Sequence, residues 1–158
     1  MESWLTEMAS NSVIRRASKE DLPAIYRIEV DVFGEDAWHP IALGFFLYLD
    51  LARFIVYDNG EIVGYAIGVL EKENYGHILN IAVRDNHRRK GVGSLLLSQL
   101  EAELEKLGAK TFYLEVRVDN YDAISFYRKN GYNIEGLRKK YYRDGMDALI
   151  MAKKLAPS

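Results

Sequence analysis

The chain has 158 residues, of which 49% are apolar and 28% are charged, and its formal net charge is −2. These values indicate a globular domain with a sizeable core and argue against binding driven by the charge of nucleic acid. The sequence has no cysteine, which excludes disulfides, cysteinate metal ligands and an acyl-cysteine intermediate. Because we find neither a long apolar run nor a signal-peptide pattern, we expect a cytoplasmic protein without a membrane span.

Hydrophobic periodicity and turn signals divide the chain into short elements. Residues 1–12 are predicted to be a flexible tail, and residues 13–158 a single domain. The expected elements, in chain order, are a strand at 13–17, a helix at 18–32, a loop at 33–40, a helix at 41–52, strands at 53–57, 61–70 and 75–83, a helix at 93–107, a strand at 110–118, a helix from 120 or 122 to about 130, and strands near 133–139 and 146–153.

Local signals mark several of these boundaries. Ser18 can cap the first helix, and the tripeptide Asp58-Asn59-Gly60 is a strong hairpin signal between two strands. Gly108 and Gly131 are well placed to end helices. The order of elements predicts a mixed α/β (α+β) fold, with helices on the faces of a central β-sheet.

A basic, glycine-containing run, His87-Arg88-Arg89-Lys90-Gly91-Val92-Gly93-Ser94, joins an expected strand to an expected helix. Free backbone N–H groups and the helix dipole at such a junction favour an anion, and the glycines let a phosphate approach. The run lacks the spacing of a P-loop, and Leu96 stands where a dinucleotide fingerprint has its third glycine. A phosphate-bearing small molecule and a solvated basic turn both remain open on this evidence.

The strand expected at residues 110–118 alternates apolar side chains with polar ones, including Glu115 and Arg117. A strand between two helices is normally apolar on both faces, so the Glu115 face is predicted to look into a groove. There a half-buried carboxyl would have a raised pKa and could act as a general base. The alternatives are a surface pair between Glu115 and Arg117, or a charge on an edge strand.

Three more residues could take part in chemistry. Tyr127 is either a core residue of its helix or a proton donor, and Asn120 is either a helix cap or a ligand. His77 begins a strand and is either structural or a partner of a glutamate. No two histidines have the spacing of metal ligands, so we predict no metal.

Taken together, the motifs resemble the GNAT superfamily of acetyl-CoA-dependent N-acetyltransferases. Within it they resemble the protein N-terminal acetyltransferases, both ribosomal-protein-alanine and archaeal. The resemblance covers about residues 13–155. It is carried by the runs Arg88-Arg89-Lys90-Gly91-Val92-Gly93-Ser94, Asn80-Ile81-Ala82-Val83, Tyr113-Leu114-Glu115-Val116-Arg117-Val118-Asp119-Asn120, Ala123-Ile124-Ser125-Phe126-Tyr127 with Gly131-Tyr132, and Lys140-Tyr141-Tyr142-Arg143-Asp144-Gly145-Met146-Asp147-Ala148.

The resemblance implies six to seven strands flanked by about four helices, with a splayed strand pair that holds acetyl-CoA as co-substrate. Glu115 would be the general base, Tyr127 the general acid, and His77 would help to hold a water near Glu115. The implied cofactor-binding residues are Ile81, Ala82 and Val83 for the pantetheine arm and thioester, Arg88, Arg89, Lys90, Gly91, Val92, Gly93 and Ser94 for the pyrophosphate, and Asn120 and Tyr127 near the arm.

The acceptor is expected to contact Tyr141, Tyr142, Phe33 and Glu35. The loop at residues 33–40 lacks the Phe-Pro-Trp turn of the ribosomal group, and it has Ala37 where the archaeal group tends to have tyrosine, so the acceptor preference stays open.

We therefore hypothesise direct acetyl transfer to the α-amino group of peptides or proteins by a monomer or weak homodimer, without nucleic-acid or membrane partners. The alternatives are acetylation of lysine or small-molecule amines, and a non-catalytic acyl-CoA sensor.

Overall fold

The computed structural model describes residues 11–156, so most of the predicted tail lies outside the described residues. Within them, seven strands form one sheet in the order β1-β2-β3-β4-β5-β7-β6. The strands are β1 (Val13–Arg16), β2 (Ala52–Asp58), β3 (Ile62–Glu71), β4 (Tyr75–Val83), β5 (Thr111–Arg117), β6 (Asn133–Arg138) and β7 (Ala148–Lys154). The α-helices are α2 (Leu22–Phe33), α3 (Pro40–Phe45), α4 (Val92–Leu107) and α5 (Tyr121–Lys129). The mixed sheet flanked by four helices confirms the predicted fold.

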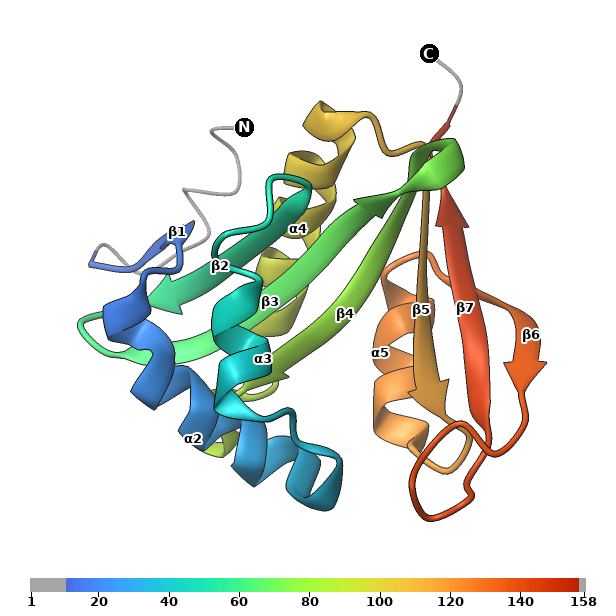
Figure 1. Ribbon diagram of the computed structural model, residues 1–158, viewed down its shortest axis with the longest axis horizontal. Coiled ribbons are helices and arrows are strands. Elements are labelled where there is room, and N and C mark those ends of the chain that lie inside the picture. The colour runs from blue at the N-terminus through green and yellow to red at the C-terminus, as the bar shows by residue number, and fades with distance from the viewer. Residues whose placement is uncertain (1–10, 157–158) are drawn as a thin grey trace.

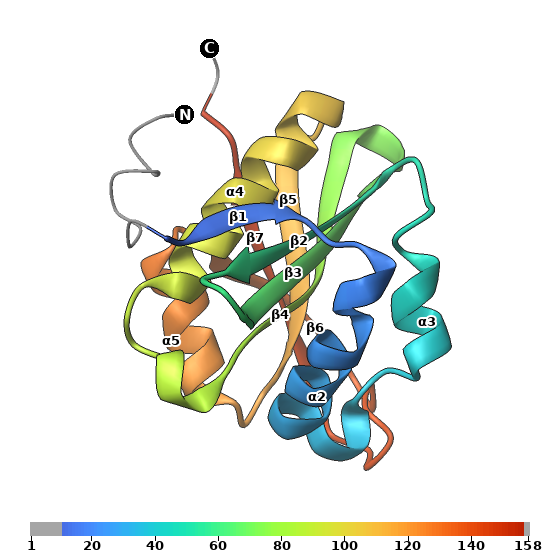
Figure 2. The same ribbon diagram turned by 90° about the vertical axis from the view of Figure 1, so that its left-hand side faces the viewer.

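Helices cover the sheet on both faces (Figures 1 and 2). α2 and α3 lie on one face, over a core cluster that includes Ile25, Leu43 and Tyr65. α4 and α5 lie on the other face, where the apolar side of α4, including Leu100, packs with Phe112 of β5. None of the helices that the structure describes is long and apolar enough to span a membrane.

Most of the predicted boundaries are confirmed to within one or two residues. The hairpin signal joins β2 to β3 as an antiparallel pair, with Gly60 at a positive φ of 107° and its N–H donating to Asp58 Oδ1 at 2.8 Å. Gly108 caps α4 in the left-handed conformation. Ser18 begins a 3₁₀ turn, from which α2 continues.

The predicted helix at residues 41–52 is wrong in its extent. α3 ends at Phe45, and the chain continues in tight turns in which Leu47 N–H donates to Gly44 at 3.1 Å. Glycine and aromatic residues are weak helix formers, and Ala52 is already paired with Val69 in the sheet. The continuous apolar pattern did not reveal this change of backbone.

β4 and β5 are parallel neighbours for only three residue pairs, from Tyr75 opposite Thr111 to His77 opposite Tyr113. Beyond the last pair the two strands diverge, which Figure 1 shows as a V between β4 and β5. The remainder of β4, Ile78 to Val83, therefore pairs with β3 on one side but not with β5 on the other. This is the splayed pair that the sequence led us to expect.

A β-bulge lies in β4 just past the point of divergence. Gly68 of β3 pairs with Ile78, and Ile67 pairs with Asn80, so Leu79 is the extra residue. Side chains on a regular strand alternate between faces, and the bulge changes that alternation. Ile78 belongs to the core on the α4 side, whereas Ala82, four residues later, belongs to the core on the α2 side.

Candidate active site

The candidate active site lies where β4 and β5 part. His77 on β4 and Tyr113 on β5 form the last residue pair between the two strands. Glu115 follows Tyr113 by two residues on β5. The sheet brings these side chains together on the face that carries α2 and α3. Apolar residues of β5, such as Leu114, point to the opposite face and are buried against α4, as the alternation predicted.

Four charged or titratable groups form a chain of contacts at this point. Glu115 Oε1 lies 2.7 Å from His77 Nε2, and Glu71 Oε2 lies 2.9 Å from His77 Nδ1. Arg138 on β6 donates its Nε–H to Glu115 Oε2 at 3.2 Å. The His77 ring stacks on the Tyr113 ring with a centroid distance of 4.2 Å. His77 thus contacts Glu115 directly, whereas the sequence led us to expect a water near the two.

The expectation of a raised pKa for Glu115 is wrong. Burial on its own would raise the pKa, because only 8% of the side chain is exposed. The hydrogen bond and charge of His77, together with Arg138, outweigh burial and lower the pKa of Glu115. For His77 burial acts to lower the pKa, but the hydrogen bonds and charges of Glu115 and Glu71 raise it. Glu115 and His77 therefore each favour the charged form of the other.

Arg117 does not pair with Glu115, so that alternative is also wrong. Its guanidinium instead bridges two loops at the end of β5, with Nη1 3.1 Å from Asp36 and Nη2 2.7 Å from Asp144. Its guanidinium carbon also lies 4.9 Å from the centre of the Tyr142 ring. Arg117 thereby connects the loop between α2 and α3 to the loop between β6 and β7.

The predicted acceptor residues lie in or next to these two loops. Tyr141 and Tyr142 pack edge to face with a centroid distance of 5.0 Å. Burial raises the pKa of Tyr141, and the charge of Glu115 raises it further. Tyr141 therefore lies close enough to Glu115 to be affected by its charge. Phe33 is half-buried against the core under α2, and Glu35 is exposed.

The basic run makes a turn that leaves the start of α4 open. Arg89 and Gly91 have positive φ angles of 63° and 84°, and no side chain caps the first backbone N–H groups of α4. Arg88 makes an ion pair with Asp85 at 2.9 Å. Uncapped N–H groups at the start of a long helix, flanked by cationic side chains, suit an anionic group.

Tyr127 lies in α5 and Asn120 directly before it, on the other face of the sheet from Glu115. Tyr127 packs with the core under α4, and burial raises its pKa. None of the hydrogen bonds found within residues 11–156 joins it to Glu115 or His77. Asn120 caps α5 by accepting the N–H of Ala123 at 3.1 Å, so the predicted cap is confirmed.

Sequence reasoning missed a buried carboxyl that fixes the strand beside the site. Glu29 on α2 is fully buried, and it accepts hydrogen bonds from the Tyr65 hydroxyl, from Asn80 Nδ2 at 2.7 Å and from the N–H of Trp38 at 2.9 Å. Burial raises the pKa of Glu29. The available signal was a glutamate on the apolar face of α2, next to Ile25 and Ile28.

Comparisons with known proteins agree with this architecture. The profile described as the acetyltransferase (GNAT) family matches residues 15–132. An N-alpha-acetyltransferase of Sulfolobus acidocaldarius is 36% identical over 157 residues, covering 92% of this chain and 94% of that protein. The [ribosomal protein bS18]-alanine N-acetyltransferase of Escherichia coli is 37% identical over 137 residues, covering 84% of this chain and 90% of that one.

The crystal structure of Ard1 from Thermoplasma volcanium superposes with a TM-score of 0.84 at 29% identity, covering 93% of this chain and 99% of that one. The chain belongs to the GNAT acetyltransferase family and is an acetyltransferase. Its similarity to proteins named N-alpha-acetyltransferase and ribosomal-protein-alanine N-acetyltransferase confirms the resemblance seen in the sequence.

The raised pKa of His77 predicts a pH dependence of stability. A group that binds its proton more tightly in the folded state stabilises that state fully below its unfolded pKa of about 6.5, and loses this contribution as pH rises through the folded pKa. We therefore compare the free energy of unfolding of the parent with that of His77→Gln. The parent's advantage over the variant should shrink as pH rises from the unfolded pKa of His77 through its folded pKa. Denaturant titrations from pH 5 to 9 measure it. An unchanged difference between the two proteins would contradict the raised pKa of His77.

Proposed function

We propose that this acetyltransferase transfers the acetyl group of acetyl-CoA to the N-terminal α-amino group of peptides or proteins, in the cytoplasm. The observation that carries the proposal is the ionised Glu115, held by His77 and Arg138 where β4 and β5 part. Two residues further along β5, Arg117 joins the two loops that border this end of the strand. The names of the relatives support the same acceptor class.

The residues at the start of α4 fit the pyrophosphate of acetyl-CoA. A Cβ at Gly91 would meet no atom within 4 Å, so the turn has open space on its outer side. A Cβ at Gly93 would lie 3.2 Å from the Phe126 ring, which explains a glycine on the inner side. Backbone N–H groups of Val92, Gly93 and Ser94, with Arg88, Arg89 and Lys90 nearby, would hold the phosphates.

When bound, acetyl-CoA supplies the activated thioester. We assign the pantetheine arm to the unpaired edge of β4 at Ile81, Ala82 and Val83, with Asn120 and Tyr127 near it on α5. A backbone N–H near Val83 would stabilise negative charge as it develops on the acetyl carbonyl oxygen.

Glu115 is the proposed general base. An α-ammonium group has a pKa of about 7.7–8.0, so a carboxylate assisted by a water can take its proton near neutral pH. The lowered pKa keeps Glu115 ionised and able to accept that proton. Glu115 thereby frees the amine lone pair for attack on the acetyl carbonyl carbon.

Tyr127 is the proposed general acid, and its position on the opposite face of the sheet suits that role. With an amine on the α2 and α3 face beside Glu115, Tyr127 on the α5 side would be placed to protonate the leaving group. Burial raises the pKa of Tyr127, so its hydroxyl is protonated at neutral pH. Tyr127 can then donate this proton to the departing thiolate.

The acceptor class is tested with matched peptides. We expect acetylation of a peptide with a free N-terminus and an internal lysine to occur at the α-amine only, because a lysine amine has a pKa of about 10.4 and needs a stronger base. Blocking the N-terminus should abolish the product. Mass spectrometry locates the acetyl group, and lysine acetylation of the blocked peptide at a comparable rate would refute the proposal.

The role of Glu115 is tested by Glu115→Gln. This change keeps the shape of the side chain and removes the base, so turnover at neutral pH should fall by roughly 10²–10⁴-fold. Raising the pH should recover part of the loss, because more of the amine is then already neutral. Steady-state kinetics measures both effects, and an unchanged acetyl-CoA affinity shows that the fold is intact. Turnover equal to that of the parent would make Glu115 a structural residue.

The pyrophosphate assignment is tested by Gly91→Glu, with Gly60→Glu as the control. Both glycines have a positive φ and open space around their Cα atoms, so the two changes impose similar backbone strain. Only Gly91→Glu places a carboxylate beside the proposed phosphates, and calorimetry should show a much weaker acetyl-CoA affinity for it alone. Equal affinities in the two variants would place the pyrophosphate elsewhere.

A further inference from the structure

Glu71 is a carboxylate beside the active site that the mechanism above does not use. It is the last residue of β3 and pairs with Tyr75, while Val69 pairs with His77. In this antiparallel register, Glu71 is a diagonal neighbour of His77 on the same face of the sheet. Glu71 reaches His77 from β3, whereas Glu115 and Tyr113 reach it from β5.

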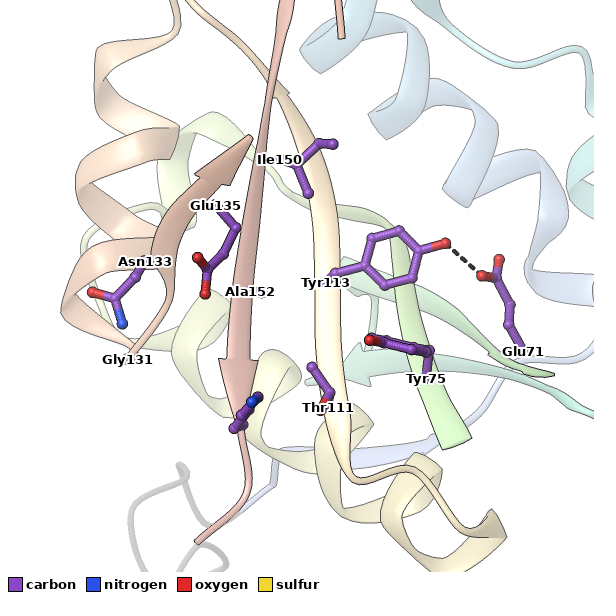
Figure 3. A pocket seen from close by; sticks show the side chains of 10 residues that line it. Glu71, Tyr75, Thr111, Tyr113, Gly131, Asn133, Glu135, Ile150 and Ala152 are labelled. Carbon is purple, nitrogen blue, oxygen red and sulfur yellow. Dashed lines mark hydrogen bonds between the residues drawn. The ribbon is translucent and has the colours of Figure 1, made fainter. Parts of the chain in front are cut away.

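The contacts of Glu71 are specific and use both carboxylate oxygens. Oε2 lies 2.9 Å from His77 Nδ1, and Oε1 accepts the hydrogen bond of the Tyr113 hydroxyl. Figure 3 shows Tyr113 reaching from β5 toward Glu71 across the top of Tyr75. Glu71 and Tyr113 both line a concavity of about 690 Å³ on this face of the sheet. The Glu71 side chain is 40% exposed there, whereas that of His77 is only 13% exposed.

These contacts decide the protonation and the orientation of the imidazole ring. A carboxylate oxygen only accepts hydrogen bonds, and His77 has one carboxylate at each ring nitrogen, so both nitrogens must carry a proton. The stacked Tyr113 ring, inclined by 13°, fixes the plane of the imidazole. With His77 charged, the two carboxylates are balanced by His77 and Arg138.

We infer that Glu71 is a positioning residue for acetyl transfer, because it holds His77 as a cation whose Nε2–H points at Glu115. The inference rests on the proposed role of Glu115. If Glu71 loses its charge, His77 has only one carboxylate to stabilise its second proton. The neutral form of His77 then appears at lower pH. In that form the ring no longer presents a charged Nε2–H to Glu115, and the Glu115 side chain is held less firmly. The other titratable or charged groups around the pair are Tyr113, Arg138, Tyr141 and Tyr142.

The test compares Glu71→Gln with the parent protein. NMR of the His77 ring gives its titration midpoint in the free protein, and we expect the midpoint to move to lower pH in the variant. Steady-state kinetics with a free N-terminal peptide gives kcat/KM from pH 6 to 10. The cationic form of His77 supports the reaction in this proposal. In both proteins kcat/KM should therefore begin to decline at the pH of the His77 NMR midpoint. One pH unit above the midpoint the loss should be about tenfold.

Glu135→Gln is the matched control. Glu135 lines the same concavity, and no hydrogen bond within residues 11–156 joins it to His77, so the midpoint and the pH profile should stay those of the parent. An unmoved His77 midpoint in Glu71→Gln would overturn the inference, as would a moved midpoint with an unmoved kinetic profile. A parent protein that fails to acetylate peptides would overturn the proposed function instead, and the NMR midpoint would still show whether Glu71 holds His77.

Discussion

The short pairing of β4 with β5 is the constraint on which the rest of the molecule depends. A parallel pair that continued along both strands would satisfy their backbone groups and leave no room between them. Here the pairing ends at His77 and Tyr113, so β5 does not cover the edge of β4 beyond that point. The bulge at Leu79 adds a local change of direction at the same place.

The charged groups at the point of divergence can be buried because their charges balance. Burying an isolated carboxylate is costly, yet Glu115 is both nearly inaccessible and ionised. His77 and Arg138 supply the compensating charge from β4 and β6, and Glu71 compensates His77 in turn. The same sheet geometry that opens a gap between two strands therefore keeps a carboxylate charged beside it.

Two further interactions tie neighbouring elements to the two strands that border this gap. Glu29 ties α2 and Trp38 to Asn80 within the bulge of β4. Arg117 ties Asp36 to Asp144 at the far end of β5. Glu115 lies on the face of the sheet that carries α2 and α3, and Tyr127 packs on the opposite face. In the mechanism that we propose, the base and the acid would therefore act from opposite faces.

The sequence alone determined the order of elements, the strand faces and the basic turn before α4, because periodicity, caps and glycine positions are local properties. It also placed Glu115 on a polar face. It failed at residues 41–52, where an apolar run hid a change from helix to turns. Only the tertiary structure decided which charges meet. Glu71, Glu115 and Arg138 lie on three different strands, so their distances depend on sheet register, and that register is why the pKa of Glu115 is lowered rather than raised.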